Sequence, residues 1–171
     1  MKINLIVALD SEHGFSKDGA IPWINEPFAK EDLKHFRNLT MGNTCVMGRK
    51  TYEDIANFMG KVNILPGRDC VVLSRDPSYY ISPEILVYDS MEHAIGTADT
   101  MKDIFIIGGG NIFEEAIKWE LSSVYITRID KNYECDKFFP YNELIKKYWT
   151  DGAWKSKEYP IIKYSKLIRR E

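Results

Sequence analysis

The chain has 171 residues, with 23 basic and 25 acidic side chains and a formal net charge of −2. This length favours one domain, residues 1–171, built around one hydrophobic core. The basic residues are scattered and no apolar run reaches the roughly 18 residues of a membrane-spanning helix, so neither nucleic acid nor a membrane is an expected partner.

The first two-thirds of the chain alternate short apolar runs with helical patterns. Residues 3–9 form a continuous apolar run, which is typical of a strand covered on both faces. Residues 30–39 then place Leu33 and Phe36 on one face at helical spacing. The same reasoning predicts further strands at 44–48, 69–73, 86–88 and 104–107, and helices at 51–58, 91–98 and 112–119.

The C-terminal third has a different pattern. Residues 124–129 and 161–167 alternate apolar and polar side chains, which indicates antiparallel strands at one side of the sheet. The predicted fold class is therefore α/β with three layers: a mainly parallel twisted sheet, flanking helices and antiparallel C-terminal strands. Ligands of such sheets bind at the carboxyl ends of the strands, and Gly48, Ser74 and Gly108 lie just past predicted strand ends.

The three cysteines, Cys45, Cys70 and Cys135, are far apart and form no Cys-x-x-Cys pair. Disulfide frameworks and zinc sites are therefore not expected, and we expect no metal ligands. Residues 1–9 lack a small-residue cleavage site, so we interpret them as a mature strand. Together these features predict a reducing, cytoplasmic location.

A run of glycines, Gly108 to Gly110, directly follows the strand predicted at 104–107. A buried strand that ends in a glycine turn at a helix N-terminus presents free N–H groups and a positive dipole end, which suits a phosphate group. The glycines are consecutive, so they lack the spacing of the usual dinucleotide fingerprint. A purely structural strand–turn–helix remains the alternative for this segment alone.

Two more strand ends carry residues suited to phosphate. In Val46-Met-Gly-Arg-Lys-Thr51, Gly48 allows a tight turn, Thr51 and the first helical N–H groups can hold a pyrophosphate, and Arg49 can reach further. In Val71-Val-Leu-Ser-Arg75, a hydroxyl and a guanidinium suit a phosphate monoester. Either segment alone could be surface charge, but together with the glycine run they predict a nucleotide site.

Asp32 borders the apolar face of the helix predicted at 30–39, one residue before Leu33 and four before Phe36. A functional acid is one interpretation of this position. The other is a first-turn carboxylate that favours the helix dipole, a role that Glu31 also fills. The pattern alone leaves both open.

Eight motifs stand in an order that resembles one family. They are Ala20-Ile-Pro-Trp23, Asp32-Leu-Lys-His-Phe36, Val46-Met-Gly-Arg-Lys-Thr51, Leu65-Pro-Gly-Arg68, Val72-Leu-Ser-Arg75, Ile106-Ile-Gly-Gly-Gly110, Tyr125-Ile-Thr-Arg-Ile-Asp130 and Asp136-Lys-Phe-Phe-Pro140. With these motifs the chain resembles the dihydrofolate reductases essentially end to end. The resemblance implies an NADPH-dependent enzyme that reduces 7,8-dihydrofolate to 5,6,7,8-tetrahydrofolate by hydride transfer to C6 and protonation of N5, and that binds antifolates.

The resemblance also implies roles for residues on the substrate side. Asp32 is the acid of the pterin pocket, Thr127 bonds to it, and Trp23 holds an ordered water near it that enters beside Ile21. Arg68 pairs with the glutamate α-carboxylate of the substrate. The remaining implied substrate positions are Ile6, Val7, Ala8, Leu33, Phe36, Ile55, Leu65 and Ile107.

On the cofactor side, Arg49, Ser74 and Arg75 correspond to the group around the 2′-phosphate of NADPH. Gly108 and Gly109 correspond to a pair joined by a cis peptide in relatives, and the loop 14–19 to a mobile lid. The remaining implied cofactor positions are Ala8, Ile21, Gly48, Lys50, Thr51, Leu73, Ile107, Gly110, Asn111, Ile112 and Phe113.

The chain departs from the family pattern between Trp23 and Asp32, where residues 24–31 form a longer segment than usual. The sequence therefore does not decide which residues form the pocket wall near Pro27 and Phe28. Glu31 is the alternative to Asp32 as the acid. A pterin or pyrimidine reductase of riboflavin synthesis and a non-catalytic binding module are the alternative functions. We expect a monomer.

Overall fold

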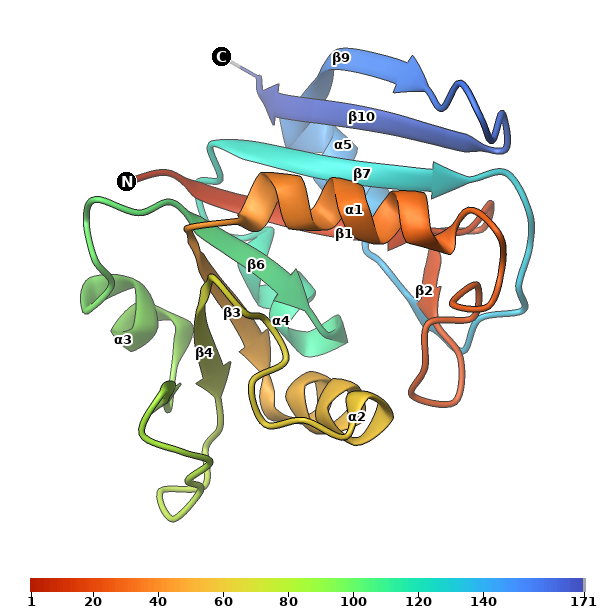
Figure 1. Cartoon of the computed structure of the whole chain (residues 1–171). Coiled ribbons are helices and arrows are strands. Elements are labelled where there is room, and N and C mark those ends of the chain that lie inside the picture. The colour runs from red at the N-terminus through yellow and green to blue at the C-terminus, as the bar shows by residue number, and fades with distance from the viewer. Residues whose placement is uncertain (171) are drawn as a thin grey trace.

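A twisted sheet of eight strands forms the frame of residues 1–170, which the computed structural model describes (Figure 1). Its strand order is β5-β4-β3-β6-β1-β7-β10-β9. The first six strands in this order, from β5 through β4, β3, β6 and β1 to β7, are parallel. Strands β10 and β9 complete the sheet and are antiparallel to their neighbours. The bounds are β1 Ile3–Leu9, β3 Thr44–Gly48, β4 Asp69–Leu73, β5 Ile85–Tyr88, β6 Ile104–Gly108, β7 Ser123–Ile129, β9 Tyr148–Lys155 and β10 Ile162–Arg169.

Helices cover both faces of this sheet, as the three-layer prediction requires. Side chains of α1 (Ala29–Thr40) and α2 (Arg49–Met59) join the hydrophobic cluster on one face. Side chains of α3 (Met91–Gly96), α4 (Gly110–Ala116) and α5 (Tyr141–Lys147) join the cluster on the other. In Figure 1, α1 crosses in front of β1 and β7 while α4 and α5 lie behind.

The strands predicted from apolar runs are confirmed, with 3–9, 44–48 and 69–73 matching to the residue. The antiparallel direction predicted for residues 124–129 was wrong in part, because β7 runs parallel to β1 and antiparallel only to β10. Alternating polarity reports which face a side chain occupies, not which way the strand runs. In β7 even the polar side chain of Thr127 is buried, with 4% of its surface exposed, so both faces of this strand are covered.

Several elements carry no strong sequence pattern and were not predicted. Edge strand β9 is mostly exposed, so its residues show no apolar period. Strands β2 (Gly14–Ser16) and β8 (Lys137–Phe138) are two or three residues long and pair only with each other. Helix α5 has one fully buried side chain, Leu144.

Helices α2 and α4 each begin two residues earlier than predicted, at Arg49 and Gly110. Helix α2 follows directly on Gly48, the last residue of β3, and α4 starts one residue after Gly108, the last residue of β6. The first turn of α2 is therefore formed by polar residues that carry no apolar periodicity. This places Arg49 and Lys50 within the helix instead of in a loop.

The long segment before α1 folds as a series of turns that anchors the helix. Backbone N–H groups of Glu26 and Ala29 donate to the carbonyls of Trp23 and Glu26, at 2.9 and 3.0 Å. Phe28, 4% exposed, packs with Trp23 and the β10 residues Ile162 and Tyr164. The question about the pocket wall thus has a structural answer: Phe28 lies in the core, and its burial fixes where α1 starts.

A buried acid organises the loop after β1. The carboxylate of Asp10, 0% exposed, accepts backbone N–H bonds from Glu12, Gly14 and Tyr133 at 2.9, 2.7 and 3.1 Å. These bonds hold the pairing of β2 with β8, and the Asp18 N–H donates to the Asp136 carboxylate at 2.8 Å.

In the chain as far as residue 170, no helix is long and apolar enough to cross a membrane.

Candidate active site

Most residues predicted to bind the substrate lie on the sheet face that α1 and α2 cover. One cluster there contains the side chains of Ile6, Phe36, Ile55, Leu65 and Ile107. On the same face Ala8 is the register partner of Thr127, across β1 and β7. Val7 is the exception, because alternation along β1 directs its side chain into the cluster on the opposite face.

Two predicted contact residues keep large apolar side chains in solvent. Leu33 is 45% and Ile21 is 40% exposed. Leu33 directly follows Asp32 on α1, and Ile21 lies two residues before Trp23. Exposed apolar side chains next to a desolvated acid and a buried indole are typical of a ligand site.

Asp32 is the acid that the fold withdraws from water. Its carboxyl, in the first turn of α1, lies near the Thr127 hydroxyl of β7 and is half-buried. Burial raises the pKa of Asp32 from 3.8 to about 6; the nearby Thr127 hydroxyl opposes this shift and the charge of Glu31 adds to it. A carboxyl with such a pKa is predominantly ionised at pH 7 yet lies close to its protonated form.

Glu31, the alternative acid, is committed elsewhere. Its two carboxylate oxygens accept hydrogen bonds from the Ser156 and Tyr164 hydroxyls, at 2.9 and 3.0 Å. Both partners belong to the β9–β10 region, and Tyr164 is the β10 register partner of Thr127. The geometry therefore supports Asp32 as the acid of the site.

Trp23 supplies a second buried polar group. The indole is 1% exposed, and its Nε1–H has no hydrogen-bond partner among the described residues. A buried donor of this kind normally bonds to protein or ordered water. The unpartnered Nε1–H of Trp23 is in keeping with the ordered water that the resemblance implies between Trp23 and Asp32.

Arg68 is a desolvated cation without a carboxylate partner in the part of the chain that the structure describes. Its Nη1 and Nη2 atoms donate to Thr40 Oγ1 and the Pro66 carbonyl at 3.4 and 3.2 Å, while its buried Nε–H has no partner. Burial lowers the pKa of Arg68, and its guanidinium lies 5.8 Å from the Phe36 ring centroid. Such an unbalanced guanidinium suits a carboxylate ligand.

The glycines at the ends of β3 and β6 form a crowded meeting point. The Gly108–Gly109 peptide bond is cis, as the resemblance implies. A Cβ atom on Gly109 would lie 2.8 Å from Thr51 Oγ1, and one on Gly48 would lie 3.1 Å from Ile112 Cγ1. Neither α2 nor α4 has a side-chain cap, so their first N–H groups are free to bind an anion.

The other predicted cofactor residues lie around this point. Leu73 is buried at the end of β4, while Asn111 is exposed in the first turn of α4. Phe113 is 2% exposed and packs edge-on against Phe15, with ring centroids 5.4 Å apart. Since Phe15 belongs to β2, this contact joins α4 to the loop that resembles the lid.

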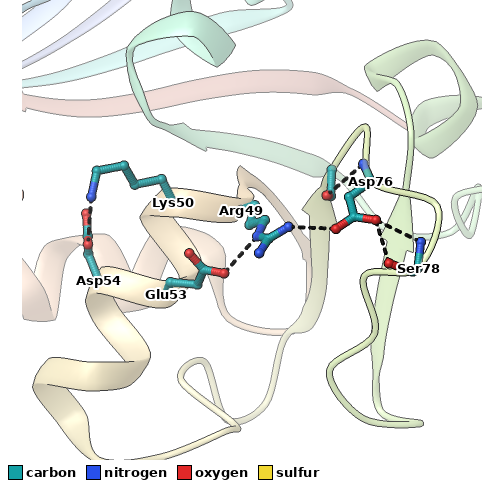
Figure 2. Close-up of polar contacts among 7 residues, drawn as sticks. Arg49, Lys50, Glu53, Asp54, Asp76 and Ser78 are labelled. Atoms are coloured by element: carbon teal, nitrogen blue, oxygen red, sulfur yellow. Dashed lines mark hydrogen bonds and ion pairs between the residues drawn. The ribbon is translucent and has the colours of Figure 1, made fainter.

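Figure 2 shows that Arg49 already has two acidic partners. Its Nε donates to Glu53 at 2.8 Å and its Nη1 to Asp76 at 3.2 Å, while the guanidinium lies 4.0 Å from the Tyr79 ring centroid. Lys50 pairs with Asp54 at 3.1 Å. The pairs within α2 follow from i,i+4 spacing, whereas only the fold brings Asp76 to Arg49.

Ser74 and Arg75 differ in their surroundings. The Ser74 hydroxyl is buried and accepts the Asp76 N–H at 3.3 Å. Arg75 is exposed and takes part in no ion pair within residues 1–170. Arg75 is thus the cation of this region with the fewest constraints.

The His35 side chain is half-buried against the β9–β10 hairpin. Its ring centroid lies 4.3 Å from that of Tyr164, and burial lowers its pKa. His35 lies one turn after Glu31, so the side of α1 that faces the β9–β10 hairpin carries both.

No group of three potential metal ligands occurs within residues 1–170.

Comparison with known proteins decides the family. A family model described as dihydrofolate reductase matches residues 2–160. The chain belongs to the dihydrofolate reductase family. It is 36% identical to the type 3 dihydrofolate reductase of Salmonella typhimurium over 140 residues, 82% of this chain and 79% of that protein. It is 32% identical to the dihydrofolate reductase of Aedes albopictus over 154 residues, 81% and 79% of the two chains.

A solved structure confirms the predicted fold class of this dihydrofolate reductase family member. The dihydrofolate reductase from Enterococcus faecalis complexed with NADP(H) and RAB-propyl superposes with a TM-score of 0.83 at 29% identity. The similarity covers 99% of this chain and 97% of that one. The predicted resemblance is therefore confirmed in sequence and in fold.

Asp32→Asn should stabilise the ligand-free protein by about 1–3 kcal/mol at pH 7.5, because it removes a desolvated charge. The folded pKa of about 6 lies above the unfolded value, so the folded state binds more protons between the two. The unfolding free energy of the wild type then falls as pH rises through this window, and the advantage of the variant vanishes near pH 4. Urea unfolding at several pH values measures this, with exposed Asp130→Asn as control. An equal gain at pH 4 and pH 7.5 would contradict it.

Proposed function

We propose that the chain reduces 7,8-dihydrofolate to 5,6,7,8-tetrahydrofolate with NADPH, by hydride transfer to C6 and protonation of N5. Family membership supports this activity. The observation that carries the residue assignment is the half-buried carboxyl of Asp32, whose pKa is raised to about 6 and which lies near Thr127 and next to the exposed apolar side chain of Leu33. This product supplies one-carbon metabolism, including thymidylate and purine synthesis.

The residues present fit a nicotinamide dinucleotide phosphate. Glycine at positions 48 and 109 lets the ends of β3 and β6 pack closely against Ile112 and Thr51, which brings the N-termini of α2 and α4 together. Thr51, Gly110 and the first N–H groups of α2 and α4 would hold the pyrophosphate; Arg49, Ser74 and Arg75 would hold the 2′-phosphate. When bound, the cofactor supplies the hydride.

Asp32 contributes an anion at the amidine side of the pterin. Its carboxylate would accept hydrogen bonds from N3 and the 2-amino group, and it favours the protonated, iminium-like ring electrostatically. The nearby Thr127 hydroxyl favours the ionised form of the carboxyl. Because the carboxyl lies at the amidine side, the N5 proton comes from water that enters beside Ile21 and bonds to the Trp23 Nε1–H.

The remaining contacts align the substrate and exclude solvent. Ile6, Ala8 and Ile107 border the pteridine, and the backbone of Val7 continues this wall. Leu33, Phe36, Ile55 and Leu65 enclose the p-aminobenzoyl ring, and Arg68 pairs with the glutamate α-carboxylate. The loop 14–19, held by Asp10 and by β8, closes over the nicotinamide side.

We further propose a monomeric, cytoplasmic enzyme that antifolates inhibit at the pterin site. Three buried free thiols, Cys45, Cys70 and Cys135, are in keeping with a reducing compartment. The neighbouring structure in complex with NADP(H) and RAB-propyl supports binding of small molecules in this fold.

Purified protein should oxidise NADPH only when dihydrofolate is added, followed by the loss of NADPH absorbance. Asp32→Asn should slow hydride transfer about 100-fold or more at neutral pH, because the amidine side loses its anion. Absence of turnover in the wild type would refute the activity and favour a binding module. A variant with near wild-type rate would move the acid assignment to Glu31.

Arg49→Ala should weaken NADPH binding about 5- to 20-fold and leave NADH binding nearly unchanged. The expected loss is modest because the guanidinium must first release Glu53 or Asp76, its present partners. Fluorescence titration of both cofactors measures the two affinities, with Lys50→Ala as the comparison variant. Equal losses for NADPH and NADH would show that Arg49 does not touch the 2′-phosphate.

Arg68→Ala should raise the KM for dihydrofolate about tenfold or more, because a desolvated carboxylate–guanidinium pair is lost. The effect should nearly disappear with a dihydropterin that lacks the glutamate. Steady-state kinetics with both substrates test this, and exposed Arg37→Ala provides the matched control. A similar increase for both substrates would mean that Arg68 supports the pocket without binding the glutamate.

A further inference from the structure

Two consecutive acids in the first turn of α1 are fastened to two neighbouring strands. The Asp32 carboxyl lies near the Thr127 hydroxyl of β7, and Glu31 accepts a hydrogen bond from Tyr164 of β10 at 3.0 Å. Thr127 and Tyr164 are register partners, so both side chains project from the same face of the sheet. Whatever fixes Glu31 therefore also fixes how Asp32 approaches Thr127.

The contacts of Glu31 are buried and polar. Ser156 and Tyr164, which donate to its two oxygens, are 9% and 4% exposed. The Ser156 hydroxyl also accepts the Tyr159 N–H at 2.9 Å, which ties the same group to the segment before β10. Glu31 thus joins α1 to the β9–β10 hairpin through a connected set of hydrogen bonds.

Within the described residues, neither of the two acids has a cationic partner. Neither Glu31 nor Asp32 forms an ion pair within residues 1–170. The groups that face Glu31 are the hydroxyls of Ser156 and Tyr164 on the hairpin, Tyr159 before β10, and the His35 ring on α1. Burial lowers the pKa of His35, so this ring is neutral at pH 7.

We propose that Glu31 is a positioning residue for Asp32. Held by Ser156 and Tyr164, it docks the first turn of α1 on the hairpin, and its uncompensated charge acts on the neighbouring carboxyl. This charge makes it easier for the Asp32 carboxyl to retain a proton, so the pH profile of hydride transfer has its midpoint at a higher pH than burial alone would set. This inference rests on the proposed role of Asp32 as the acid of the pterin site.

The test is the pH profile of hydride transfer in the NADPH-bound enzyme. Glu31→Gln keeps the shape and can still bond to Tyr164, but it removes the charge. The midpoint of the profile should fall by about half a pH unit or more. A 13C NMR titration of the Asp32 carboxyl in the ligand-free protein should show the same shift without depending on activity. An unchanged midpoint and titration would overturn the proposal.

Control variants separate charge from structure. Tyr164→Phe keeps the charge and loses one anchor, so it should raise the KM for dihydrofolate without lowering the midpoint; a lowered midpoint would overturn the charge assignment. Glu143→Gln removes an exposed acid of α5 and should change nothing. If His35→Asn reproduced the shift, the charge of Glu31 would not be its cause.

Asp32→Asn, measured beside these variants, distinguishes the two levels of the argument. If it retains hydride transfer, the proposed acid itself is wrong. If it loses hydride transfer while Glu31→Gln keeps the wild-type midpoint, Asp32 remains the acid and only the role of Glu31 fails.

Discussion

The site depends on one carboxyl group that the fold keeps away from bulk water. Ionised carboxylates are costly to bury without partners, and the Asp32 carboxyl has a hydroxyl nearby but no ion pair within residues 1–170. The protein stabilises this arrangement from outside the pocket. Phe28 packs the start of α1 into the core, Glu31 binds the helix to the β9–β10 hairpin, and Thr127 meets the carboxyl from β7.

This arrangement explains why so few polar residues are needed. The electron donor performs the redox chemistry, so the protein must orient two flat rings, supply one anion and exclude water. A neutral carboxyl would be easier to bury but would not favour a protonated pterin. The pKa of about 6 is the compromise between burial and function, a common feature of catalytic acids.

The cofactor side follows a different strategy. Its backbone is shaped by glycines that leave no room for a side chain, and its cations are solvent-accessible. Arg49 is held by Glu53 and Asp76 before any phosphate arrives, so it is oriented but electrostatically satisfied (Figure 2). Exposed Arg75 has no such partner in the described chain. The two arginines, alike in sequence, are therefore unlike in what a phosphate must displace.

The sequence by itself determined the family and the parallel strands, and it named the candidate site residues. Apolar runs such as residues 3–9 report burial directly, and ordered motifs such as Asp32-Leu-Lys-His-Phe36 need no coordinates. Only the tertiary structure decided matters that depend on distant contacts. It decided which of two consecutive acids is desolvated, where Phe28 points, which strand β7 runs parallel to, and that Asp76 meets Arg49. The physical reason is that local pattern specifies the polarity of a position, whereas desolvation and charge pairing depend on segments far away along the chain.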